Sequence, residues 1–190
     1  MKRLFAAVKI HPDDDFLAKY CDLKHKLRNE QIKWVEDHNI HVTLKFFGET
    51  EEQKIPEICS VLKNRISTTS SIGLQLTDLG IFGSSYAPKV IWVGIEPYAE
   101  LSNLMKNLHS DLKIIGFKPD RQNLVPHLTL GRIKFLRDKI IFNHILGQFK
   151  TIASSTICIG EAALFESIMH REGPEYNALE KFPFIKKELP

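Results

Sequence analysis

His41-Val42-Thr43-Leu44 and His127-Leu128-Thr129-Leu130 are two nearly identical segments, one in each half of the chain. Each consists of a histidine, an aliphatic residue, a threonine and a leucine. In a chain of 190 residues with 8 histidines, chance would rarely produce this pattern twice. Each copy is also followed by a predicted helix. The repetition therefore predicts two related lobes, each carrying one copy of the motif.

The spacing within each copy is that of a β-strand with one buried face. In a strand, residues i and i+2 point to the same side about 6.5 Å apart, and the residue between them points to the other side. His41 and Thr43 would therefore share an accessible face, while Val42 and Leu44 would be buried. Two such strands side by side would bring two imidazoles and two hydroxyls to one small target.

The rest of the chain predicts a mixture of strands and helices. Residues 4–10 and the continuously apolar run 90–95 have strand character, and the apolar residues within 16–27 follow helical spacing. We assign Trp34 and Trp92 to the core. Because 43% of residues are hydrophobic and no linker-like segment interrupts them, residues 1–190 should form one domain. We expect an α+β, bilobal fold, in which two pseudo-symmetric halves have antiparallel sheets lining a central cleft and helices outside.

Two histidines facing one target indicate acid-base chemistry. The unperturbed imidazole pKa of about 6.5 allows one histidine to be neutral and the other protonated near neutral pH, as a general base and a general acid. Hydroxyl groups donate hydrogen bonds without a full charge, which suits a target that is already anionic. A phosphodiester fits best, particularly a strained cyclic one. The spacing alone does not say which histidine is the acid.

Two alternatives compete with this interpretation. A single His-x-Thr on a strand is more often a structural pair than a site, but the duplication favours a site. His38 and His41 have the spacing of zinc ligands, but no nearby cluster of carboxylates or cysteines completes a tetrahedral set. We therefore expect no metal and no cofactor.

The motifs resemble those of the 2H phosphoesterase superfamily, and within it the RNA 2′,3′-cyclic phosphodiesterases, historically called 2′-5′ RNA ligases. This family has a bilobal fold in which two related α+β halves place the motifs on a central cleft. The resemblance covers almost the whole chain and rests on Arg3-Leu4-Phe5-Ala6, Trp34-Val35, His41 to Glu49, Val90 to Gly94, Pro126 to Arg132, Ser167 and Tyr176.

The resemblance implies a role for each motif residue. His41 would be the proton donor to the departing 3′ oxygen of the ribose, and His127 the proton acceptor that activates water. Thr43 and Thr129 would hold the phosphate oxygens. The product would be a terminal 2′-phosphate.

Arg132 resembles the arginine that follows the second motif in the family and binds phosphate. An anion site normally includes at least one permanent cation. In a regular strand, however, a residue five positions after His127 faces the wrong side. We expect a bulge at Gly131 to turn Arg132 inward. An exposed arginine at the end of the strand is the alternative.

Further substrate-binding residues are expected around the cleft. Lys45 is four residues after His41 and would lie on the same face at the mouth of the cleft, with an ordinary surface position as the alternative. The resemblance offers Phe5, Phe47 and Tyr176 as aromatic rings on which a terminal base could stack, with core packing as the alternative.

The expected substrate is the 2′,3′-cyclic phosphate end of an RNA or oligonucleotide. Alternatives are a 2H enzyme acting on small cyclic nucleotides or on 2′-5′ RNA ligation, and a non-catalytic module that binds RNA ends. The net charge of +3 suits an anionic ligand but is too small to indicate binding of long nucleic acid. Without a membrane-length apolar run, and with three cysteines in no metal or redox spacing, we expect a soluble, cytoplasmic monomer.

Overall fold

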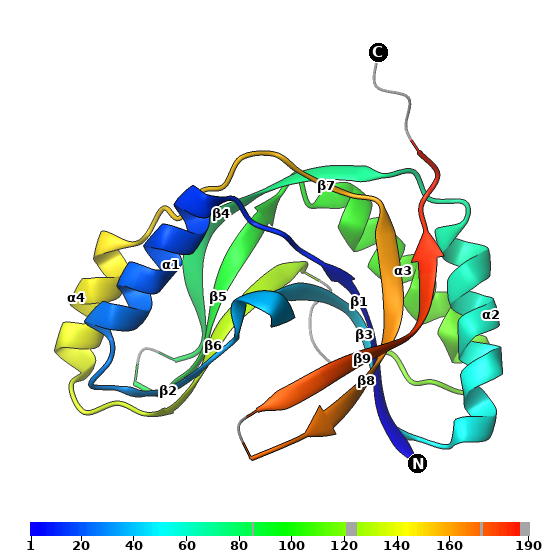
Figure 1. Cartoon of the computed structure of the whole chain (residues 1–190), viewed down its shortest axis with the longest axis horizontal. Helices are drawn as coiled ribbons and strands as arrows, with labels where there is room; N and C mark the ends of the chain where they lie inside the picture. Colours follow the sequence, from blue (N-terminus) through cyan, green and yellow to red (C-terminus); the bar gives the residue numbers. More distant parts are fainter. Residues whose placement is uncertain (85, 121–124, 172, 187–190) are drawn as a thin grey trace.

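The computed structural model describes residues 1–84, 86–120, 125–171 and 173–186. Within them the chain forms an α+β fold with two antiparallel sheets, which confirms the predicted fold class (Figure 1). The four-stranded sheet has the order β3-β1-β8-β9 and the five-stranded sheet the order β2-β6-β5-β4-β7. Strands β3 and β6, which carry the two motifs, contact each other.

The strands have the following bounds. The four-stranded sheet consists of β1 (Lys2–Lys9), β3 (His41–Thr50), β8 (Glu161–Met169) and β9 (Pro174–Pro183). The five-stranded sheet consists of β2 (Gln31–Trp34), β4 (Ile72–Gly83), β5 (Pro88–Glu96), β6 (His127–Phe135) and β7 (Ile157–Ile159). Both β3 and β6 begin at the histidine of their motif.

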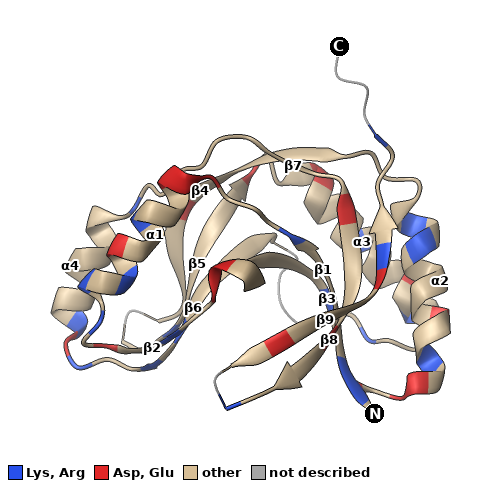
Figure 2. Cartoon of the chain, in the orientation of Figure 1, with Lys and Arg blue, Asp and Glu red and all other residues tan. Residues whose placement is uncertain are grey.

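The helices cover the sheets from outside (Figure 1). Helices α2 (Ile55–Ile66) and α3 (Ala99–Ile114) pack on the four-stranded sheet, while α1 (Asp14–Lys26) and α4 (Lys139–Gln148) lie together beside the five-stranded sheet. Acidic and basic side chains both occur on α1 and on α2 (Figure 2). Among the described residues, no helix combines the length and the apolar character needed to cross a membrane.

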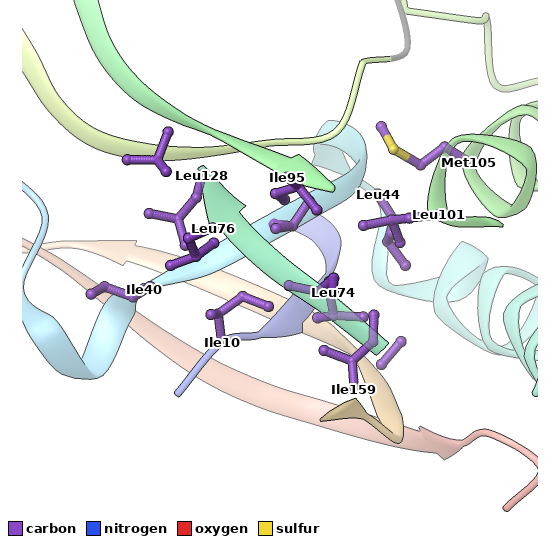
Figure 3. Close-up of a cluster of buried hydrophobic side chains, with 14 of the residues drawn as sticks. Ile10, Ile40, Leu44, Leu74, Leu76, Ile95, Leu101, Met105, Leu128 and Ile159 are labelled. Atoms are coloured by element: carbon purple, nitrogen blue, oxygen red, sulfur yellow. The ribbon is translucent and has the colours of Figure 1, made fainter. Parts of the chain in front are cut away.

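One connected cluster of buried side chains joins the two sheets (Figure 3). It includes Leu44 from the four-stranded sheet, Ile10 directly after β1, and Leu76 and Leu128 from the five-stranded sheet. The aliphatic residues of both motifs therefore point into the core, as their spacing predicts. The histidines and threonines are left on the opposite face of each strand, where a site can form.

Candidate active site

The structure brings the two motifs together. The contact between β3 and β6 places both His-x-Thr faces beside each other, and the histidine and threonine of each are half-buried. Positive charge on His127 lowers the pKa of His41, which shows that the two imidazoles lie within electrostatic reach. The paired arrangement that the duplication predicts is therefore present.

Backbone carbonyls hold both imidazoles in the same way. His41 Nδ1 lies 2.6 Å from the carbonyl oxygen of Asn39, and His127 Nδ1 lies 3.0 Å from that of Val125. Both carbonyls belong to the residue two positions before the histidine. Because a carbonyl can only accept a hydrogen bond, Nδ1 carries the hydrogen in the neutral ring. Nε2 of each ring is left to exchange a proton with a substrate.

Burial lowers the pKa of both histidines from the ordinary value of 6.5. At His41, burial is the largest cause, and the positive charges of Arg132 and Lys9 lower the pKa further against the raising effect of the Asn39 carbonyl. At His127, burial is again the largest cause, with Arg132 adding to it. The free protein therefore favours neutral imidazoles at pH 7, and a bound anion would shift both towards the protonated form.

Strand β3 contains one extra residue directly after its motif threonine. Thr43 pairs with Ala7, and Lys45 pairs with the next residue of β1, Ala6. Leu44 therefore has no partner, and the strand forms a β-bulge there. After the bulge the alternation of side chains is reversed, because one residue has been inserted into a period of two.

The bulge corrects the predicted placement of two binding residues. Lys45 is only 3% exposed and lies on the helix-covered side, where its Nζ forms an ion pair with the carboxylate of Asp120. Phe47 packs edge-on against Phe117, with ring centroids 5.0 Å apart. Neither residue lies at the paired histidines. An unbroken alternation from His41, which we assumed for Lys45, does not hold in this strand.

Phe46 lies on the face of β3 that carries His41, where we predicted Lys45 and Phe47. It is 53% exposed and pairs with Phe5, and the two ring centroids are 6.1 Å apart. The sequence contained a signal for it, because a bulge in the first motif strand, like that predicted in the second, would have placed Phe46 on the same face as His41.

Strand β6 repeats the bulge. Thr129 and Gly131 pair with consecutive residues of β5, so Leu130 is the extra residue. Arg132 therefore turns to the face that carries the motif, and its positive charge lowers the pKa of both motif histidines. Arg132 therefore lies on the predicted face of the strand, but its side chain is exposed, and the extra residue is one position earlier than predicted.

Gly131 has a different role from the predicted one. A Cβ at this position would lie 2.8 Å from the side chain of Ile32 and 2.9 Å from the ring of Trp34. A glycine is therefore needed to let β2 approach β6 closely, rather than to form the bulge.

A side chain from a helix binds the carbonyl of each bulged leucine. His109 of α3 places Nε2 3.0 Å from the carbonyl oxygen of Leu44. The Tyr20 hydroxyl of α1 lies 2.8 Å from the carbonyl oxygen of Leu130 and 2.7 Å from that of Val35. Both bulges are thus held from the core side, where a free carbonyl would be costly.

Aromatic rings surround both histidines. Phe5 and Tyr176, both predicted binding residues, have ring centroids 5.2 Å and 5.4 Å from that of His41. The ring centroids of Phe82 and Trp92 lie 4.7 Å and 6.3 Å from that of His127.

Trp92 is therefore not a core residue, contrary to our assignment. It is half-buried on the face that carries the motif, because its strand neighbours Ile91 and Val93 occupy the core face. Phe82, which comes from β4 and stacks on Trp92 at 5.1 Å, was not among the residues predicted for the site.

A shallow pocket lies at His41, and it is too small to enclose a water molecule. Its lining residues come from all four strands of the sheet and from the turn before β3, and they are Phe5, Lys9, Asn39, His41, Phe165 and Tyr176. Within the described residues, no group of three or more His, Cys, Asp or Glu side chains is placed to hold a metal ion.

Comparison with known proteins identifies relatives over most of the chain. The model of the LigT-like phosphoesterase family matches twice, at residues 12–92 and 93–176. The RNA 2′,3′-cyclic phosphodiesterase of Methanothermobacter thermautotrophicus is 31% identical over 83% of this chain and 85% of its own length. The enzyme of the same name from Aeropyrum pernix is 33% identical over 78% of this chain and 84% of its own.

Solved structures share the fold. A protein of Thermus thermophilus superposes with a TM-score of 0.76 at 24% identity, covering 98% of this chain and 100% of its own. E. coli LigT complexed with 3′-AMP superposes with a TM-score of 0.71 at 21% identity, covering 97% of this chain and 98% of its own. The two matches of the family model, together with the RNA 2′,3′-cyclic phosphodiesterase of Methanothermobacter thermautotrophicus, establish that the chain belongs to the LigT-like phosphoesterase family.

Proposed function

We propose that the protein hydrolyses RNA 2′,3′-cyclic phosphate ends to 2′-phosphates, using two histidines and no metal. The observation that carries this proposal is the pair of imidazoles on contacting strands, each anchored through Nδ1 to a backbone carbonyl. The relatives named RNA 2′,3′-cyclic phosphodiesterase support the substrate. The positive charge of Arg132, which acts on both imidazole rings, supports an anionic substrate.

The proposed reaction is one displacement at phosphorus. His127 Nε2 accepts a proton from water as the water oxygen attacks phosphorus, and the bond from phosphorus to the 3′ oxygen breaks. Protonated His41 donates its Nε2 proton to that oxygen, leaving a 3′-hydroxyl and a 2′-phosphate. Thr43 and Thr129 donate hydrogen bonds to the phosphate oxygens, and Arg132 balances the charge that they gain.

The test is hydrolysis of an oligonucleotide with a 2′,3′-cyclic phosphate end in the presence of EDTA, with identification of the product. We expect a 2′-phosphate, and a 100- to 10,000-fold lower rate in His41→Ala and in His127→Ala, the range typical of acid-base groups. His144→Ala, which removes an exposed histidine on α4, is the control. A strict requirement for added metal, or full activity in both motif variants, would reject the proposal.

We also propose that residues 1–190 act as one domain of two related lobes, and as a cytoplasmic monomer. The double match of the family model supports the relation between the lobes. So do the shared features of β3 and β6, which both begin at a histidine and both have an extra leucine three residues later.

A further inference from the structure

A groove on the four-stranded sheet adjoins the pocket at His41. Its volume is about 260 Å³, and it shares Lys9, Phe165 and Tyr176 with the pocket. We propose that this groove binds the nucleotide that precedes the terminal one, so that the enzyme favours oligonucleotides over mononucleotides. This inference rests on the proposed function, because it takes the surface beside His41 as the place of the terminal cyclic phosphate.

Small side chains on adjacent strands create the groove. Ala7 of β1 pairs with Ala163 of β8, and Ala178 of β9 also lines the groove. The five-stranded sheet differs at the equivalent position, the partner of the motif threonine, where it has Trp92 in place of Ala7. The Trp92 ring covers Gly80 so closely that a Cβ there would lie 2.2 Å from it. The space is therefore filled in one sheet and left open in the other.

The charges along the groove suit a phosphodiester. Lys9, His11 and Lys181 line it, with Glu161 as the acidic side chain among the lining residues. Lys181 pairs with Glu161 at 3.1 Å, and this pair is largely exposed. Lys9 adds a second positive charge, next to the pocket at His41. A phosphate that joins the last two nucleotides would therefore meet net positive charge.

Connectivity of the substrate favours this occupant. A 2′,3′-cyclic phosphate uses both of these oxygens of the last ribose, so the RNA continues only through the 5′ oxygen. The preceding nucleotide must then lie directly beside the terminal one. An aromatic ring with cations nearby is a typical arrangement for single-stranded nucleic acid, and Tyr176 supplies a ring that lines both spaces.

The test compares kcat/KM for a nucleoside 2′,3′-cyclic phosphate and for a trinucleotide with the same end. We expect the trinucleotide to be favoured about 5- to 150-fold, the range that one stacked base provides. Ala178→Leu, at an exposed groove position, should remove most of this preference and leave the mononucleotide rate within about twofold. Asn177→Leu places the same leucine side chain at the preceding residue of β9, outside the groove lining, and should preserve the preference.

Salt dependence tests the phosphate contact. Lys181→Gln should reduce the dependence of log kcat/KM on log salt for the trinucleotide by about 0.7, the contribution of one phosphate contact in a single strand. Lys106→Gln removes the same charge from an exposed position on α3 and should leave the slope unchanged.

The outcomes separate this inference from the proposed function. Equal kcat/KM for the two substrates, or an equal loss on both in Ala178→Leu, would reject the groove while hydrolysis stands. If neither substrate is hydrolysed, the proposed function fails. The groove is then tested by comparing the binding affinities of a mononucleotide and a trinucleotide that each end in a 2′-phosphate. Tighter trinucleotide binding that Ala178→Leu abolishes would support the groove, and equal affinities would reject it.

Discussion

The two motif strands share one backbone plan but carry different side chains. In β3 and in β6 the histidine binds a carbonyl two residues earlier, and a leucine bulges directly after the threonine. The residue five positions after the histidine then faces the site, and it is Phe46 in β3 but Arg132 in β6. The backbone plan thus fixes two equivalent imidazoles. The side chains differ in what they can bind. Arg132 suits the β6 side to a charged phosphate, and Phe46 suits the β3 side to a nucleotide base.

The two histidines should give the largest effects, and a better leaving group should separate them. With a nucleoside phosphodiester that carries a p-nitrophenyl leaving group, we expect His41→Ala to recover most of its 100- to 10,000-fold loss, because this leaving group needs no proton. His127→Ala should remain slow, because activation of water is still required. Rescue of the His127 variant instead would exchange the two roles.

Replacing Arg132 should produce the next largest effect. Loss of a charged hydrogen bond to phosphate in Arg132→Gln should lower kcat/KM about 10- to 150-fold. With increasing pH, kcat/KM rises when the general base loses its proton, and it falls when the general acid loses its own. Since the charge of Arg132 lowers the pKa of His41 and of His127, its removal raises both values and moves the whole pH profile upward.

Arg132→Lys is the matched control for this shift. Lysine keeps the positive charge but loses the planar fork that binds two phosphate oxygens, so the rate should fall while the pH optimum stays in place. An unchanged optimum in Arg132→Gln would contradict the electrostatic role.

Phe46 should affect substrate binding more than chemistry. We expect Phe46→Ala to raise KM about fivefold or more with little change in kcat, because a base stacked on an exposed ring contributes to binding. Phe135→Ala, which removes an equally exposed ring near the end of β6, is the control. A fall in kcat at constant KM would argue against stacking on Phe46.

The groups that hold the bulges should have the smallest effects, and on stability. Tyr20→Phe removes the hydroxyl beside the Leu130 carbonyl and should lower the free energy of unfolding by about 1 kcal/mol, measured by urea denaturation. The carbonyl keeps a second bond, from the Val35 N–H at 2.8 Å, which limits the loss. Tyr98→Phe, at an exposed position, should change nothing measurable. Equal stability of all three proteins would show that Tyr20 is not needed for the bulge.

The fold class and the pairing of the two motifs could be predicted from the sequence. Alternation with a period of two is local, so Val42 and Leu128 could be assigned to the core and His41 and His127 to the opposite face. The repetition of the motif then predicted that the two faces would meet. These inferences need only the residue types and their spacing.

Which side chains after each motif face the site could not be predicted, because it depends on contacts between distant segments. The extra residue in each strand depends on pairing with a neighbouring strand. It also depends on a distant helix side chain, Tyr20 or His109, that binds the carbonyl of the extra leucine. Neither partner is close in sequence, so the positions of Lys45, Phe46 and Phe47 could not follow from local alternation. The groove likewise depends on the alignment of alanines from separate strands, because only sheet pairing brings such residues together.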